Sequence, residues 1–433
     1  MSGADRPAPS VPTRGIKGVG GDPRERTSDV AEAPGKIWFR DLDEAVIEAD
    51  RCIQCASCVA ACPSDSIGID AEEGRPTLVR MCTGCSRCWD YCPRSGLRYE
   101  RVIELAREER GLEEPKTYAA RAAGAPAASD AADAPRAPRA DASAVESGQD
   151  GGVVTALLAD LIEAGDLDGA IVARESDEEP LKGEATLATS REDLLEAAGS
   201  VYNQTMALGQ IDDLLAEADL ETDDPRLAFV GTPCMIQGAS ALERYGHESA
   251  DPIALTVALM CTRTFEHERL LSTVSDFGVD PADVAKLDVT GGVLTATDED
   301  GETLLEADVD AFSAAGLRGC DECSDFVGGA ADVSAGSVGT DEGWTTVVVR
   351  TERGREAWER ADGLESTEID VPEAMDRLAD WNRRRARSIV PREYDPESPV
   401  GITYEEHRAA YDGTDREPEP LNPARVHQYE EWC

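Results

Sequence analysis

The sequence predicts an α/β domain, a mixed sheet with flanking helices, preceded by a small α+β domain rich in cysteine. Three observations indicate this arrangement. Segments with strand patterns alternate with segments of helical pattern between residues 146 and 390. Two closely spaced cysteine runs lie within residues 36–105. The length of 433 residues is enough for two or three domains.

Composition places the boundaries of five segments. Residues 1–35 are rich in Pro, Gly and charge and are expected to be a disordered tail. An Ala-, Pro- and Asp-rich stretch marks residues 106–145 as a linker. Residues 391–433 are expected to form an irregular acidic tail. The cysteine-rich domain (36–105) and the α/β domain (146–390) lie between these segments.

Helix and strand signals follow one another along the α/β domain. Asp150 is the expected N-cap of a helix over "GGVVTALLADLIEAG", whose apolar residues have helical spacing and which Gly165 ends. The segments "GAIVA", "RLAFVG" and "IALTVALMC" are predicted to be buried strands. Thr232 and Pro233 fit the N-cap and first residue of a helix after the second strand.

Charge excludes one class of function. The net charge is −46, with 88 acidic residues against 42 basic ones, spread over every segment. Such a surface favours a halophile, in whose concentrated salt the repulsion is screened; an ordinary acidic protein is the alternative. Nucleic acid is not an expected partner, because its binding needs a basic face.

Thirteen cysteines accompany an N-terminus without an apolar leader, and no apolar run is long enough to form a transmembrane segment. A cytoplasmic location is expected, free or peripheral on the inner face of the cell membrane. Metal or redox chemistry is therefore expected of the cysteines, rather than disulfides.

Eight cysteines form the pattern C-x2-C-x2-C-x3-C-P twice, in "CIQCASCVAACP" and "CTGCSRCWDYCP". This pattern resembles the two-cluster bacterial ferredoxins, in which the fourth cysteine of each run binds the other cluster. Zinc is the alternative, since C-x2-C pairs also bind it. Two sets are expected to bind one 4Fe–4S cluster each: set 1 (Cys52, Cys55, Cys58, Cys92) and set 2 (Cys82, Cys85, Cys88, Cys62).

Four further cysteines form the candidate set 3. Cys234 and Cys261 each follow a predicted strand, at the sheet edge where ligands bind in α/β proteins. Cys320 and Cys323 belong to "CDEC" in a Gly-rich loop that is too polar to be core. A third iron–sulfur cluster is favoured, with zinc or unrelated thiols as alternatives. Cys433 is interpreted as incidental.

Five motifs in order resemble the coenzyme F420 hydrogenase/dehydrogenase beta-subunit family: "SGQDGGVVTALLADLIEAGDLDGAIV", "AAGSVYNQT", "FVGTPCMIQG", "ALMC" and "CDECSDFVGGAADVSAGSVG". With the acidic composition, the resemblance points to a haloarchaeal source. It implies FAD, coenzyme F420 (a deazaflavin) and a 4Fe–4S cluster on set 3, which makes three clusters in all.

The resemblance also implies the cofactor contacts. The helix that "QDGGV" opens offers free N–H groups to an FAD phosphate, and the anionic coenzyme needs local cations. The residues expected to contact FAD are Asp150, Gly151, Gly152, Val153, Thr155, Ser200, Tyr202, Asn203, Gly231, Thr232 and Pro233. Those expected to contact the coenzyme are Arg263, Arg318 and Lys182. The basic cluster "WNRRRARS" could bind the coenzyme tail or a partner, or be a solvated helix face.

The function implied by the resemblance is that of an F420-dependent oxidoreductase. Hydride passes from reduced F420 to FAD, and single electrons then pass through the three clusters to an external acceptor, either ferredoxin or a quinone-reducing membrane complex. No catalytic side chain is assigned, since hydride transfer between bound flavins needs no acid or base. Two alternatives stay open: a non-autonomous wiring subunit of a hydrogenase or respiratory complex, and a ferredoxin-dependent flavin reductase of a tetrapyrrole double bond.

Overall fold

A computed structural model shows how the chain folds. The tails (1–35 and 391–433), part of the expected linker and Asp150 lie outside the residues that it describes. The described residues are 37–70, 73–95, 103, 106–107, 110–123, 151–218, 220, 222–244 and 246–389.

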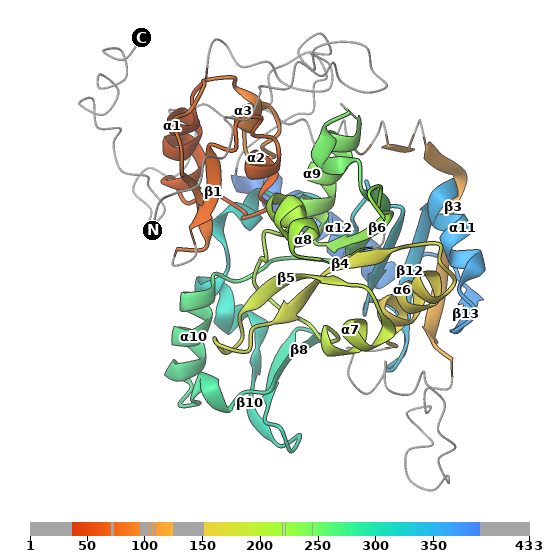
Figure 1. Cartoon of the computed structure of the whole chain (residues 1–433). Coiled ribbons are helices and arrows are strands. Elements are labelled where there is room, and N and C mark those ends of the chain that lie inside the picture. Colours follow the sequence, from red (N-terminus) through yellow and green to blue (C-terminus); the bar gives the residue numbers. More distant parts are fainter. Residues whose placement is uncertain are drawn as a thin grey trace, which may run out of the picture.

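An eight-stranded mixed sheet organises the large domain (Figure 1). Its central neighbours β11, β7, β6 and β4 pair in parallel, and the outer pairs are antiparallel. This arrangement confirms the predicted mixed sheet, including its three buried strands. The strand order is β13 (Leu364–Glu368), β3 (Gly111–Ala122), β12 (Thr345–Thr351), β11 (Val333–Gly336), β7 (Ile253–Leu259), β6 (Leu227–Gly231), β4 (Gly169–Glu175) and β5 (Gly183–Ala188).

Helices cover both faces of the sheet, and β6 shows why. Leu227 and Phe229 pack into the core on the side of α9, whereas Ala228 and Val230 pack into the core on the side of α6 and α11. Successive side chains of a strand point to opposite faces, so an apolar run requires cover on both. The helices are α6 (Val153–Glu163), α7 (Arg191–Glu196), α8 (Ile211–Glu217), α9 (Pro233–Arg244), α10 (His267–Asp276), α11 (Glu352–Arg360) and α12 (Glu373–Ile389).

The cysteine-rich segment forms a small domain on the α9 side of the sheet (Figure 1, orange). It contains α1 (Phe39–Leu42), α2 (Ser57–Ala60) and α3 (Arg87–Asp90), together with the hairpin of β1 (Ile67–Asp70) and β2 (Arg75–Leu78). A separate antiparallel sheet is made of β8 (Lys286–Thr290), β9 (Val293–Thr297) and β10 (Thr303–Asp308). Within the described residues, no helix has the length and apolar character needed to cross a membrane.

Two sequence expectations differ from the structure. Residues 111–122 belong to the predicted linker, but they form β3, which pairs with both β12 and β13. The segment "GLEEPKTYAARA" lacks apolar alternation, and its strand state is set by partners far along the chain. The N-cap of α6 is Gly152, with a φ of 62°, rather than Asp150. Glycine adopts this left-handed conformation without strain.

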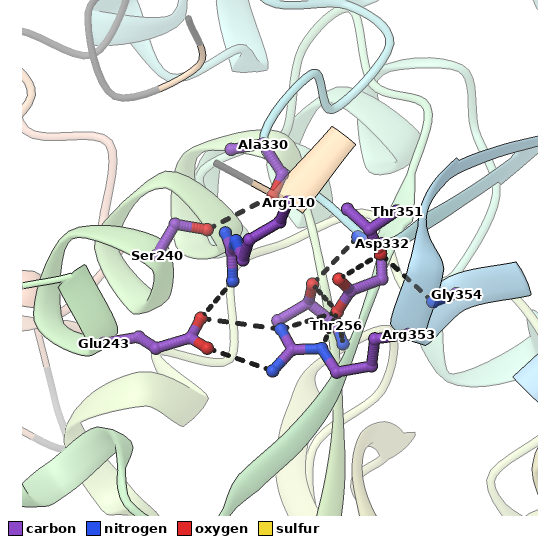
Figure 2. A network of polar contacts seen from close by, with 9 residues as sticks. All are labelled: Arg110, Ser240, Glu243, Thr256, Ala330, Asp332, Thr351, Arg353 and Gly354. Atoms are coloured by element: carbon purple, nitrogen blue, oxygen red, sulfur yellow. Dashed lines mark hydrogen bonds and ion pairs between the residues drawn. The ribbon is translucent and has the colours of Figure 1, made fainter. Parts of the chain in front are cut away.

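Asp332 is the centre of a buried polar network that joins β7, β11, β12 and α9 (Figure 2). Its carboxylate accepts hydrogen bonds from Thr256 N (2.8 Å), Thr351 Oγ1 (2.6 Å) and Arg353 Nε (2.9 Å). Burial raises the pKa of Asp332, but Arg353 and the hydroxyl donors outweigh it and hold the pKa below its usual value. Arg353 also pairs with Glu243 of α9 at 3.0 Å, so the network ties the sheet to the helix above it.

We expect Asp332→Ala to lower the free energy of unfolding by about 1–3 kcal/mol, because it leaves the buried Thr256 N–H and Thr351 hydroxyl without their acceptor. Chemical denaturation under anoxia measures this loss. The matched control is Arg360→Ala, which removes an exposed pair with Asp166 and should cost only about 0–1 kcal/mol. Equal losses in the two variants would contradict a structural role for the network.

Candidate functional site

The two cysteine runs of the small domain fold alike. Cys52 Sγ accepts a hydrogen bond from Gln54 N, and Cys82 Sγ accepts one from Gly84 N, each at 3.3 Å. In both runs the residue directly after the second cysteine is left-handed and precedes one helical turn. Each loop therefore curls so that its N–H groups approach its own sulfur atoms, which suits a bound anionic thiolate cluster.

The cysteines of the two runs cross over, as the ferredoxin resemblance implies. Cys52 and Cys58 interact electrostatically with Cys55 and with Cys92 from the second run. Cys88 interacts with Cys85, Cys82 and with Cys62 from the first run. The structure thus places thiols of the two runs near one another in the predicted combinations, and the assignment of a 4Fe–4S cluster to each set stays a prediction.

Set 3 assembles from three distant segments at the carboxyl edge of the large sheet. Cys234 lies in the first turn of α9, Cys261 follows β7, and Cys320 lies in the 3₁₀ helix η7 (Arg318–Glu322) just before Cys323. Cys234 and Cys261 each interact electrostatically with both cysteines of "CDEC".

The surroundings of set 3 favour four ionised cysteines that bind one positively charged group together. Burial raises the pKa of the Cys234 thiol far above its usual value, and the neighbouring thiols raise it further. Thr232 Oγ1 lies 3.1 Å from its sulfur, and Gln204 Nε2 donates to the same sulfur at 3.4 Å. Of the four thiols, those of Cys234 and Cys320 are buried and those of Cys261 and Cys323 half-buried. Such a set fits an iron–sulfur cluster, whose metal charge makes ionised sulfur stable there.

Set 3 also lies beside set 1. Cys234 interacts electrostatically with Cys55 of the small domain. Sequence reasoning did not identify the charged residues at this contact, which are Arg51, Arg94 and Glu322, or Gln204 beside Cys234. The three charged residues could have been identified from the sequence by their position, since each lies within two residues of a cysteine.

The glycines expected to contact FAD lie along the same sheet edge. Gly151 N donates to Thr345 Oγ1 at the start of β12 (3.2 Å), and Gly152 precedes the first turn of α6, which holds Val153 and the half-buried Thr155. Gly231 ends β6, three strand positions from β12, or roughly 14 Å at the usual strand spacing. Thr232 and Pro233 continue from it into α9.

A cavity of about 1030 Å³ opens between the small domain and the large one. Its lining includes Cys62 of set 2, Gln204, and two of the predicted contacts, Lys182 and Asn203. Asn203 also has a structural role, since its Oδ1 accepts a hydrogen bond from Gly183 N at 2.8 Å.

The neighbouring Tyr202 packs near Phe265, and its hydroxyl accepts from Val289 N at 2.9 Å, while Ser200 is half-buried. Tyr202 therefore has structural contacts of its own, and its contact with FAD stays a prediction.

The three cations expected to hold the coenzyme all have carboxylate partners. Arg263 pairs with Asp321 at 2.8 Å, Arg318 pairs with Asp50 at 3.0 Å, and Lys182 pairs with Glu179. Their role toward the coenzyme stays a prediction.

Within the basic cluster of α12, Arg385 donates to the carbonyls of Thr262 and Cys320 at 2.8 and 2.9 Å. This side chain lies against set 3 rather than on a solvated face.

Comparison with known protein families gives separate matches for the small domain and for the large domain. Residues 45–98 match the family described as "4Fe-4S dicluster domain". Two further stretches match the family "Coenzyme F420 hydrogenase/dehydrogenase, beta subunit", residues 136–212 in its N-terminal part and residues 224–375 in its C-terminal part.

Individual relatives give the same result. The chain is 31% identical over 233 residues to the beta subunit of the coenzyme F420 hydrogenase of Methanosarcina barkeri, covering 52% of this chain and 78% of that protein. It is 26% identical over 359 residues to the F subunit of the F(420)H(2) dehydrogenase of Methanosarcina mazei, covering 78% and 91%. In a solved structure of the F420-reducing NiFe hydrogenase complex from Methanosarcina barkeri, one chain superposes with a TM-score of 0.54 at 27% identity, covering 64% of this chain and 90% of that one.

We expect Cys261→Ala to lower the iron content by about one to four atoms per chain, because a cubane with only three thiolates loses its unligated iron or is released whole. Iron and acid-labile sulfide assays on anaerobically purified protein measure the loss. Electron paramagnetic resonance should still show two reduced clusters, from sets 1 and 2. The control is Cys433→Ala, which should keep the full iron content; wild-type iron in Cys261→Ala would rule out set 3 as a cluster site.

Proposed function

The chain belongs to the coenzyme F420 hydrogenase/dehydrogenase beta-subunit family, and from this premise we propose that it passes electrons from reduced coenzyme F420 to an external acceptor. The observation that carries the proposal is that Cys234 of set 3 and Cys55 of set 1 pack in the same buried cluster. It joins the family domain to the two-cluster domain, so the chain contains its own route for single electrons.

FAD, when bound, would exchange a hydride with the deazaflavin and single electrons with a cluster. The chain's own groups for it would be the N–H groups at the start of α6, which attract phosphate, and the backbone at Gly231. Gly151 suits the entry to α6, because a Cβ there would lie 2.9 Å from the Ala120 carbonyl oxygen, and this close approach of chain to chain requires glycine.

The order in which the three cysteine sets lie next to one another supports a direction of electron flow, from set 3 through set 1 to set 2. Cys234 of set 3 packs in one buried cluster with Cys55 of set 1, and Cys58 of set 1 packs in another with Cys88 of set 2. Set 2 is nearest to solvent, since Cys85 is exposed. Electrons would therefore leave at the surface around Cys85.

The relatives favour work within a larger assembly. The F subunit of the F(420)H(2) dehydrogenase of Methanosarcina mazei aligns over 91% of its length and over 78% of this chain. We therefore propose that this chain is an electron-input subunit whose acceptor is another redox protein or a membrane respiratory complex.

Stopped-flow mixing tests the proposed activity. Anaerobic holoprotein mixed with reduced coenzyme F420 should lose its flavin absorbance and then gain the spectrum of reduced clusters. The same protein mixed with NADH should remain oxidised. Bleaching by NADH together with no response to reduced coenzyme F420 would reject the proposal.

The surface beside set 2 generates a second test. Met81 is 83% exposed and Val79 is 57% exposed, and Met81 directly precedes Cys82. An exposed apolar pair beside a solvent-facing cluster suits the docking of an electron acceptor. We expect Met81→Glu to slow electron delivery to washed membranes of the source organism about tenfold, equal to about 1.4 kcal/mol.

A small viologen dye needs no docking surface, so its reduction by Met81→Glu should be unchanged. Phe277→Glu is the matched control, because Phe277 is also exposed (45%) but follows α10. Equal slowing with dye and membranes would place the defect in the clusters and reject a docking role.

A further inference from the structure

A buried ion pair joins the ligand loops of set 1 and set 3. Arg51 directly precedes Cys52, and Glu322 directly precedes Cys323. Their Nε–Oε1 and Nη2–Oε2 distances are 2.9 and 3.0 Å, and both side chains are only 2% exposed. A bidentate pair fixes the relative position of its partners. It therefore holds together two loops that lie 271 residues apart in sequence.

A second buried arginine bridges the same loops. Arg94, two residues after Cys92, is 2% exposed, and its Nε donates to the carbonyl of Gly319 at 2.9 Å. The backbone N–H of Arg94 donates to Cys92 Sγ at 3.4 Å, and Gly319 directly precedes Cys320. One buried guanidinium thus lies between a ligand loop of set 1 and a ligand loop of set 3.

Two glycines allow the loops to meet. A Cβ on Gly319 would lie 2.1 Å from the Arg51 carbonyl oxygen, and a Cβ on Gly238 would lie 2.1 Å from Ser57 Oγ. Ser57 Oγ in turn is 3.3 Å from Cys55 Sγ. No side chain fits at these two points of close approach, so the charges of the junction act on both sets at short range.

We propose that Arg94 raises the reduction potentials of the clusters on set 1 and set 3, and that Glu322 cancels the charge of Arg51 at the same junction. Reduction adds one negative charge to a cluster, and a buried cation beside it stabilises the reduced form. Arginine keeps its charge at every accessible pH. This inference rests on the proposed function only in treating sets 1 and 3 as redox-active clusters.

Two substitutions should move the potentials in opposite directions. Arg94→Gln removes a positive charge and should lower the potentials of both clusters. Glu322→Gln leaves Arg51 uncompensated and should raise them. Each change should alter the reduction equilibrium constant at least about tenfold, which is about 59 mV for a one-electron couple.

Redox titration of the full-length holoprotein, followed by electron paramagnetic resonance, measures these potentials. Arg94→Lys separates charge from shape, because it keeps the charge but loses the planar fork; its potentials should stay close to wild type. Arg383→Gln is the control for charge alone, since Arg383 is 51% exposed and its guanidinium pairs with Asp380 on the surface of α12. It should shift neither potential.

Three results would overturn the proposal: unchanged potentials in Arg94→Gln, equal shifts in Arg94→Gln and Arg94→Lys, or a Glu322→Gln potential at or below that of wild type. If Arg94→Gln does not retain its iron, Glu322→Gln decides, since a raised potential there supports the effect of charge at this junction and an unchanged or lowered one overturns the proposal. Dithionite is the reductant, so the titration is independent of coenzyme F420. A protein that fails the coenzyme test but shows opposite shifts would reject the proposed activity and retain this inference.

Discussion

Eleven of the twelve described cysteines are buried or half-buried, and the ionisation of their thiols is the constraint on which the site depends. A thiol taken out of water holds its proton more strongly, as at Cys58 and Cys234, where burial is the largest cause of a raised pKa. Ionised sulfur is stable there only beside a compensating positive charge. The fold therefore has to bring four thiols together at each predicted cluster position. These thiols come from several segments of the chain.

Arginine side chains gather where sets 1 and 3 meet, in a chain whose net charge is −46. Arg51, Arg94 and Arg385 all lie against the loops of sets 1 and 3. Two of these side chains are almost wholly buried. Salt therefore acts differently on the acidic surface and on these arginines, since it screens exposed charges but has little effect on buried ones.

The polar residues of the last family motif have structural roles. Glu322 binds Arg51, and Asp321 binds Arg263, which explains why "CDEC" is charged although it is buried. Asp325 accepts hydrogen bonds from Gly328 N and Gly329 N and so closes the following loop. Asp332 joins three strands and, through Arg353, α9. These carboxylates shape the loop that supplies two cysteines.

Local sequence patterns determined the cysteine loops, the buried strands and the start of α9. The two four-cysteine runs specify their own loops, because all but one of the residues expected to bind each cluster lie within a few positions of one another. An apolar run indicates strands such as Leu227–Gly231, and Thr232 with Pro233 indicates the start of α9. Tertiary structure decided the rest. β3 becomes a strand only because β12 and β13 pair with it, and the junction depends on Arg51 and Glu322 meeting across 271 residues. A contact of that range leaves no periodicity in the sequence, since its energy comes from burial and charge that exist only once the chain has folded.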